Sequence, residues 1–169
     1  MGCGMAREPL ARGNDMRKTR PRRNGQMTGM RGAYLVASEL TKNGLIVSPT
    51  SRSSFGADLL VTDEKCKKAW SVQVKTNNGR PNFWLANKHS LQTTSPSHVY
   101  VMVNLCQANE RQKKKYLAPD FYIVPSRIIA KNLRTTRRRT GSIFYSLWLQ
   151  DIEKYKDRWK IFGTTSASP

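Results

Sequence analysis

Two stretches of the sequence decide the fold, Gly56-Ala57-Asp58-Leu59-Leu60-Val61 and Ala69-Trp70-Ser71-Val72-Gln73-Val74-Lys75. Both alternate or run apolar in the manner of β-strands. The polar segment 62–68 between them is typical of a turn. The sequence therefore predicts an antiparallel β-hairpin.

The register of this hairpin determines which polar side chains meet. If the hairpin is symmetric about residues 65 and 66, Asp58 lies directly opposite Gln73, and directly opposed residues share a face of the sheet. The two-residue period of a strand places Lys75 on that face too, with Val72 and Val74 on the other. A carboxylate, an amide oxygen and an ammonium group would then converge. Such a patch can hold a hard cation and a water molecule against a phosphate.

The composition points to a polyanionic partner. The 169 residues include 30 Lys and Arg but only 11 Asp and Glu, which gives a net charge of +19. Nucleic acid is the first candidate partner and an anionic membrane surface the second. Because no stretch resembles a transmembrane span or a signal peptide, we expect a soluble, cytoplasmic protein that has no membrane partner. The three cysteines lack zinc-ligand spacing and are interpreted as free thiols.

The rest of the chain predicts one α/β (α+β) domain, a mixed central sheet flanked by helices. Residues 1–27 form a basic tail that we expect to be disordered, 28–162 the domain, and 163–169 a flexible tail. Met30, Ala33, Tyr34, Ala37 and Leu40 form the apolar stripe of the first helix. The predicted helices are 28–43, 126–133 and 151–159; the further strands are 45–47, 82–85, 98–105, 121–124 and 143–149; 107–118 and 134–139 are loops, and Trp84 and Trp148 are core residues.

A helix, a strand, a Gly-x-Asp strand and a strand carrying (D/E/Q)-x-Lys resemble the PD-(D/E)XK nuclease-like superfamily. The resemblance covers residues 28–105 and is strongest to the Holliday-junction-resolvase-like and restriction-endonuclease-like branch. It implies a metal-dependent DNA endonuclease with this mixed-sheet fold. Gln73 stands where Glu or Asp is usual, so the site carries one formal charge less.

The resemblance also implies roles for individual residues. Asp58, Gln73 and the backbone carbonyl of Val74 would hold Mg²⁺ or Mn²⁺, and Lys75 would orient the attacking water. Resolvase-like members often present a glutamate early in the first helix, where this chain has none. Glu39, later in that helix, is the candidate for this ligand; the alternative is a solvated surface glutamate.

Basic and polar residues around the predicted site suit contacts with a phosphate backbone. We expect duplex or branched DNA as the partner and a homodimer where both strands are cut. The alternatives are an inactive nucleic-acid-binding protein of the same fold and an RNA-binding protein. The candidate binding residues are Arg52, Ser53, Ser54, Thr76, Asn77, Arg80, Lys113, Lys114, Lys115, Arg137, Arg138 and Arg139.

Overall fold

A computed structural model describes residues 23–51, 56–105 and 118–163. The largest element is a mixed five-stranded sheet in the order β1-β2-β3-β5-β6. Pairing is antiparallel throughout except between β3 and β5, which run parallel. The predicted mixed sheet flanked by helices is therefore confirmed. Its strands are β1 (Leu45–Pro49), β2 (Leu59–Asp63), β3 (Ala69–Asn77), β5 (His98–Asn104) and β6 (Asp120–Pro125).

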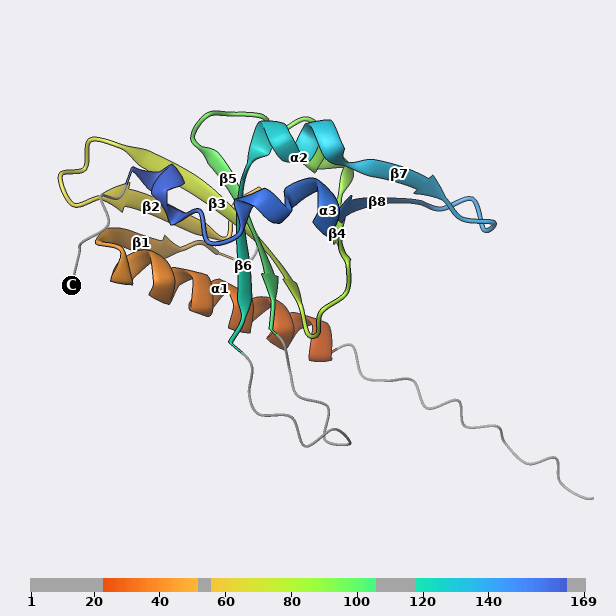
Figure 1. The fold of residues 1–169 in the computed structure, drawn as a ribbon, viewed down its shortest axis with the longest axis horizontal. Helices are drawn as coiled ribbons and strands as arrows, with labels where there is room; N and C mark the ends of the chain where they lie inside the picture. The colour runs from red at the N-terminus through yellow and green to blue at the C-terminus, as the bar shows by residue number, and fades with distance from the viewer. Residues whose placement is uncertain (1–22, 52–55, 106–117, 164–169) are drawn as a thin grey trace, which may run out of the picture.

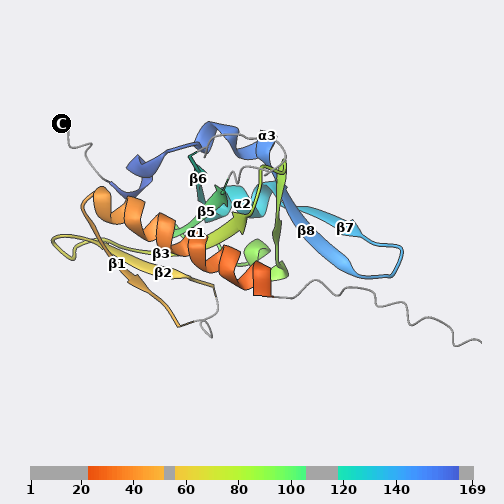
Figure 2. The same ribbon diagram turned by 90° about the horizontal axis from the view of Figure 1, so that it is seen from below.

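Helix α1 (Arg23–Lys42) covers one face of this sheet in both views (Figures 1 and 2). It begins before the predicted start at residue 28 and ends at Lys42, two residues before Gly44, whose φ of 76° lies in the left-handed region. Val36 and Leu40 are fully buried, whereas Tyr34 is exposed. The predicted stripe was wrong about Tyr34. The buried face of the helix runs through Gly32, Val36 and Leu40, and a search for apolar side chains overlooks a glycine.

A second sheet packs on the opposite face, with strand order β4-β8-β7. Its strands are β4 (Phe83–Ala86), β7 (Arg134–Arg137) and β8 (Ile143–Trp148), and helix α2 (Ser126–Asn132) precedes β7. The prediction of a loop over residues 134–139 was wrong, because Arg134–Arg137 pair with β8. The predicted last helix is a short α3 (Leu149–Ile152) followed by the 3₁₀ turns Glu153–Tyr155 and Trp159–Phe162.

The core has two parts, one on each face of the main sheet. Val72 and Val74 lie in the part under α1 with Val36 and Leu40. Trp84 lies in the part under the second sheet and is 1% exposed, and its indole N–H donates to the carbonyl of Val103 at 3.1 Å. Trp84 is a core residue, as predicted. Within the described residues, no helix is long and apolar enough to cross a membrane.

The backbone of α1 approaches β3 closely at Gly32. A Cβ atom at this position would lie 1.9 Å from Oγ1 and 2.8 Å from Cβ of Thr76, and Thr76 is a β-branched residue of the central strand that has little room to move. We expect Gly32→Ala to lower the free energy of unfolding by about 1–3 kcal/mol, the usual cost of overpacking. Urea unfolding followed by circular dichroism measures this change.

Gly29→Ala is the matched control for that substitution. No heavy atom lies within 4 Å of the added Cβ at Gly29. Alanine has the higher helix propensity, so this variant should be as stable as the wild type or slightly more stable. The double change Gly32→Ala with Thr76→Gly should recover part of the loss. Equal stability of the two single variants would contradict the close packing of α1 on β3.

Candidate functional site

The register of the β2–β3 hairpin matches the sequence prediction. Leu59 pairs with Val72 and Leu60 with Ser71, and the same register continued by one residue places Asp58 opposite Gln73. Asp58 itself lies just before β2, where its N–H donates to the carbonyl of Val72 at 2.8 Å. The backbone of Asp58 is thus fixed beside β3, just before the start of β2.

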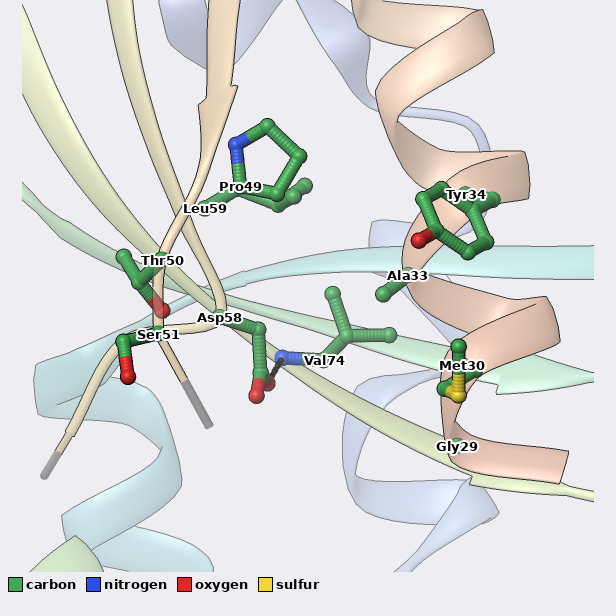
Figure 3. Close-up of a pocket in the computed structure, with 10 residues that line it drawn as sticks. All are labelled: Gly29, Met30, Ala33, Tyr34, Pro49, Thr50, Ser51, Asp58, Leu59 and Val74. Atoms are coloured by element: carbon green, nitrogen blue, oxygen red, sulfur yellow. Dashed lines mark hydrogen bonds between the residues drawn. The ribbon is translucent and has the colours of Figure 1, made fainter. Parts of the chain in front are cut away.

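The carboxylate of Asp58 accepts hydrogen bonds from two groups of β3. Oδ2 accepts a hydrogen bond from the side-chain amide of Gln73. It also accepts one, at 2.7 Å, from the backbone N–H of Val74, which Figure 3 shows. The N–H and C=O of one strand residue point to the same edge of the strand. The carbonyl of Val74 therefore points to the edge on which Asp58 lies. One carboxylate, one side-chain amide and one backbone carbonyl meet there.

This edge opens on a cavity of about 290 Å³ between α1 and the end of β1. Asp58 is the only acidic residue among the described residues that line it. Figure 3 shows the Asp58 carboxylate within this lining, at the side opposite Met30 and Tyr34 of α1. The cavity is lined by Gly29, Met30, Ala33, Tyr34, Pro49, Thr50, Ser51, Asp58, Leu59 and Val74.

Lys75 lies two residues beyond Gln73 on β3 and is partly buried. Its side chain borders a second cavity, of about 320 Å³, whose walls include Phe83, Trp84 and Leu85 of β4. Burial lowers the pKa of the Lys75 ammonium, and the nearby negative charge of Asp58 opposes that shift. The electrostatic coupling joins Lys75 to Asp58.

This coupling gives a test that needs no catalysis. Because the charge of Asp58 raises the pKa of Lys75, Asp58→Asn should lower that pKa further below the ordinary value. The pKa can be measured from the ¹³Cε chemical shift of Lys75 during an NMR titration. Asp63→Asn, at the other end of β2, is the control and should leave the Lys75 pKa unchanged. A Lys75 pKa that is the same in Asp58→Asn and the wild type would contradict the coupling.

Glu39 lies away from this cluster. The residues of α1 that line the Asp58 cavity end at Tyr34, and Glu39 follows about 7.5 Å further along the helix axis. The carboxylate of Glu39 lies 4.0 Å from the ammonium of Lys42 in the next turn. The structure therefore brings together Asp58, Gln73 and Val74, with Lys75 two residues beyond Gln73 on the same strand, but does not bring Glu39 to them.

The donor set is compatible with a weakly held hard cation. In the part of the chain that the structure describes, no group of three or more His, Cys, Asp and Glu residues could hold a metal ion. The oxygen atoms at the β3 edge belong to the Asp58 carboxylate, the Val74 carbonyl and the Gln73 amide, and Mg²⁺ and Mn²⁺ favour such ligands. A single carboxylate gives the site a low charge, so these ions would bind weakly.

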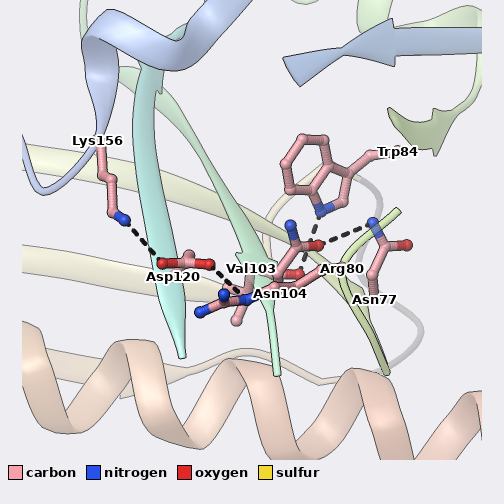
Figure 4. A network of polar contacts seen from close by, with 7 residues as sticks. All are labelled: Asn77, Arg80, Trp84, Val103, Asn104, Asp120 and Lys156. Atoms are coloured by element: carbon pink, nitrogen blue, oxygen red, sulfur yellow. Dashed lines mark hydrogen bonds and ion pairs between the residues drawn. The ribbon is translucent and has the colours of Figure 1, made fainter. Parts of the chain in front are cut away.

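Two of the predicted binding residues that follow Lys75, Asn77 and Arg80, have polar partners within the fold. Asn77 donates to the carbonyl of Phe83 at 3.0 Å and to Oδ1 of Asn104 at 3.1 Å. Arg80 lies 3.2 Å from Asp120, which also binds Lys156 at 2.8 Å (Figure 4). The hydroxyl of Thr76 is buried against α1 at Gly32, where no described residue forms a hydrogen bond with it. These contacts hold β4 and β6 beside the end of β3.

The predicted arginine cluster is exposed at the β7–β8 hairpin, which projects from the body of the protein (Figures 1 and 2). Arg137 ends β7, and the side chains of Arg137, Arg138 and Arg139 are all exposed. The remaining predicted binding residues, Arg52, Ser53, Ser54, Lys113, Lys114 and Lys115, lie outside the described residues.

A pair of exposed aromatic rings, Phe83 and Trp148, was not expected from the sequence. Trp148 was predicted to be a core residue, but it is 37% exposed, as is Phe83. Their ring centroids lie 5.7 Å apart on the outer face of the second sheet. Trp148 ends an apolar strand, and a strand sequence does not say which of its faces another layer covers. The prediction for Trp148 was therefore wrong.

Comparisons with known proteins show a structural similarity but no sequence match. No protein-family model matches the sequence, and a search of curated proteins found no match. Among solved structures, the chain is similar to Hjc from Archaeoglobus fulgidus, described as a Holliday junction resolvase from an archaeal hyperthermophile. The TM-score is 0.48 at 12% identity, over 81% of this chain and 97% of that chain.

Proposed function

We propose that this protein is a divalent-metal-dependent endonuclease that hydrolyses phosphodiester bonds in DNA. The observation that carries the proposal is the convergence of the Asp58 carboxylate, the Gln73 amide and the Val74 backbone on one edge of β3, with Lys75 two residues beyond Gln73 on the same strand. The same residues carry the resemblance to the PD-(D/E)XK motif. The net charge of +19 favours a polyanionic substrate.

Each residue has a distinct part in this proposal. Asp58 supplies the anionic ligand, Val74 a carbonyl, and Gln73 an amide oxygen once its side chain rotates. Bound Mg²⁺ or Mn²⁺ would polarise a phosphoryl oxygen and lower the pKa of a water molecule. Lys75 places positive charge beside the phosphate. Because burial lowers its pKa, the Nζ atom of Lys75 gives up a proton more readily than that of an exposed lysine.

One observation favours a second candidate, a nucleic-acid-binding protein that does not cut. The Gln73 amide donates to Asp58, so a neutral side chain satisfies the carboxylate where the related nucleases have a second acid. In that case the β7–β8 hairpin, with its exposed Arg137, Arg138 and Arg139, would bind the phosphate backbone. The residues at the edge of β3 would then stabilise the fold without binding a metal ion.

A nicking assay on supercoiled plasmid separates the two candidates. The full chain is incubated with Mg²⁺, Mn²⁺, Ca²⁺ or EDTA, and the products are resolved on agarose. The nuclease predicts nicked or linear plasmid with Mg²⁺ or Mn²⁺ and none with EDTA. Binding of DNA without nicking in any metal would establish the second candidate. Branched DNA and structured RNA, tested in parallel, identify the preferred substrate.

A further inference from the structure

The outer face of the second sheet carries aromatic rings and arginines side by side. The strand register places Phe83 opposite Trp148, and the two-residue period brings Phe144 to the same face. Arg134 of β7 pairs with Ser146, so its side chain belongs to that face too. We call Phe83, Trp148, Phe144, Arg134 and Arg138 the platform.

The arginines of the platform lie over its rings. The guanidinium carbon of Arg134 lies 5.5 Å from the centroid of Trp148, and that of Arg138 lies 5.1 Å from the centroid of Phe144. Both distances are within the range of cation–π interactions. Two hydrogen bonds to Asp151, at 3.0 and 3.2 Å, hold Arg134 in place. On the platform, aromatic rings therefore alternate with positively charged guanidinium groups.

We infer that the platform binds an unpaired nucleic-acid strand. Unpaired bases stack on aromatic rings and on guanidinium planes, while arginines also contact the phosphates. A duplex hides its base faces, so it could use the arginines but not Phe83 and Trp148. The combination of exposed rings and positive charge therefore favours single-stranded over double-stranded nucleic acid.

The position of Phe83 connects the platform with the proposed active site. Phe83 belongs to the platform, and it also lines the cavity of about 320 Å³ that Lys75 borders. A strand stacked on Phe83 would thus lie beside Lys75. This step rests on the proposed nuclease function, and it specifies a substrate that has an unpaired segment, such as branched DNA. Binding of a single strand by the platform does not depend on cleavage.

Fluorescence anisotropy in EDTA tests the platform without cleavage. The probes are a labelled 20-nucleotide oligothymidylate and a labelled duplex of 20 base pairs, at one fixed salt concentration. The variants are Phe83→Leu and Trp148→Leu, which keep apolar bulk but remove the ring. Each should weaken binding of the oligothymidylate by about five- to a hundredfold, the value of one base–aromatic stack, and change duplex binding less than twofold.

Two further variants exclude indirect effects. Trp148→Phe keeps a ring and should recover most of the affinity for the single strand. Leu60→Ala removes an apolar side chain that is 54% exposed on β2, outside the platform, and should bind as the wild type does. Thermal melts of all variants exclude a loss of folding, and a variant that fails to fold is replaced by Phe144→Leu, which removes another ring of the platform and for which the same preferential loss is expected.

The inference is overturned if the leucine variants bind the single strand within twofold of the wild type. It is also overturned if they lose single-strand and duplex binding equally, or if the wild type prefers the duplex; the exposed rings would then be a surface for a protein partner. If the protein nicks plasmid but fails this binding test, the nuclease proposal is retained and only the platform inference is rejected. If the platform binds the single strand but the protein never nicks plasmid, the platform inference is retained and only the nuclease proposal is rejected.

Discussion

Asp58→Asn is expected to abolish metal-dependent nicking of plasmid, with a loss of at least about a hundredfold. Asparagine keeps the shape of the side chain and can still accept the hydrogen bond from the Val74 N–H. It removes the only carboxylate charge among the described residues lining the cavity. A catalytic metal ion stabilises the transition state by several kcal/mol, and each change of about 1.4 kcal/mol in the activation free energy changes the rate tenfold.

The control for this prediction is Asp63→Asn. Asp63 ends β2, which begins just after Asp58, and its carboxylate accepts hydrogen bonds from the backbone N–H groups of Lys67 and Lys68 at 2.7 and 3.0 Å in the hairpin turn. Asp63→Asn also loses one negative charge but lies at the far end of β2, so it should nick at the wild-type rate. Rates are compared as initial velocities in Mg²⁺ and Mn²⁺ after thermal melts have shown both variants to be folded. Undiminished nicking by Asp58→Asn would exclude Asp58 as a metal ligand.

The hairpin could be predicted from the sequence because a short polar turn leaves few alternatives. A strand exposes alternate residues on opposite faces, so a turn symmetric about residues 65 and 66 fixes every pair from the turn back to Asp58. The observed pairing of Leu59 with Val72 has this register. The buried Val72 and Val74 follow from the same alternation.

The second sheet could not be predicted in the same way. Arg134-Thr135-Thr136-Arg137 has no apolar alternation, and it forms a strand because β8 offers an edge with which to pair. Trp148 and Trp84 look alike in the sequence, yet one is 37% and the other 1% exposed. Which of them is buried depends on the layer that packs on each face, and residues far apart in the chain build that layer.

The sequence also could not show whether the Gln73 amide presents its N–H or its oxygen to the site. From the motif, the amide oxygen of Gln73 was expected to be a ligand of the cation. In the structure the side-chain N–H of Gln73 instead donates a hydrogen bond to Asp58. Both uses suit an amide, because it carries a donor and an acceptor on one side chain. A glutamate has no such choice, and this difference can be measured.

Gln73→Glu is expected to make the stability of the protein depend on divalent metal. Without an ion, the new carboxylate would face Asp58 in place of the amide donor, and two adjacent carboxylates repel each other. The Tm in EDTA should therefore fall below that of the wild type. With Mg²⁺ or Mn²⁺ the two acids become two anionic ligands, which bind a hard cation more tightly than an acid and an amide do.

Differential scanning fluorimetry measures this dependence. At an ion concentration of about a hundred times Kd, binding stabilises the folded state by about 2.7 kcal/mol, which corresponds to a rise in Tm of about 5–10 °C for a chain of this size. The wild type should shift less in the same titration. Monovalent salt of equal ionic strength excludes general screening.

The double change Asp58→Asn with Gln73→Glu is the matched control. It keeps one carboxylate and one amide at the β3 edge but exchanges their positions, so the amide can again donate to the acid. Its Tm in EDTA should exceed that of Gln73→Glu, and its response to Mg²⁺ should be as small as that of the wild type. If Gln73→Glu melts at the same temperature with and without either ion, the edge of β3 at Asp58 does not hold a metal, and the positive surface alone remains to explain binding.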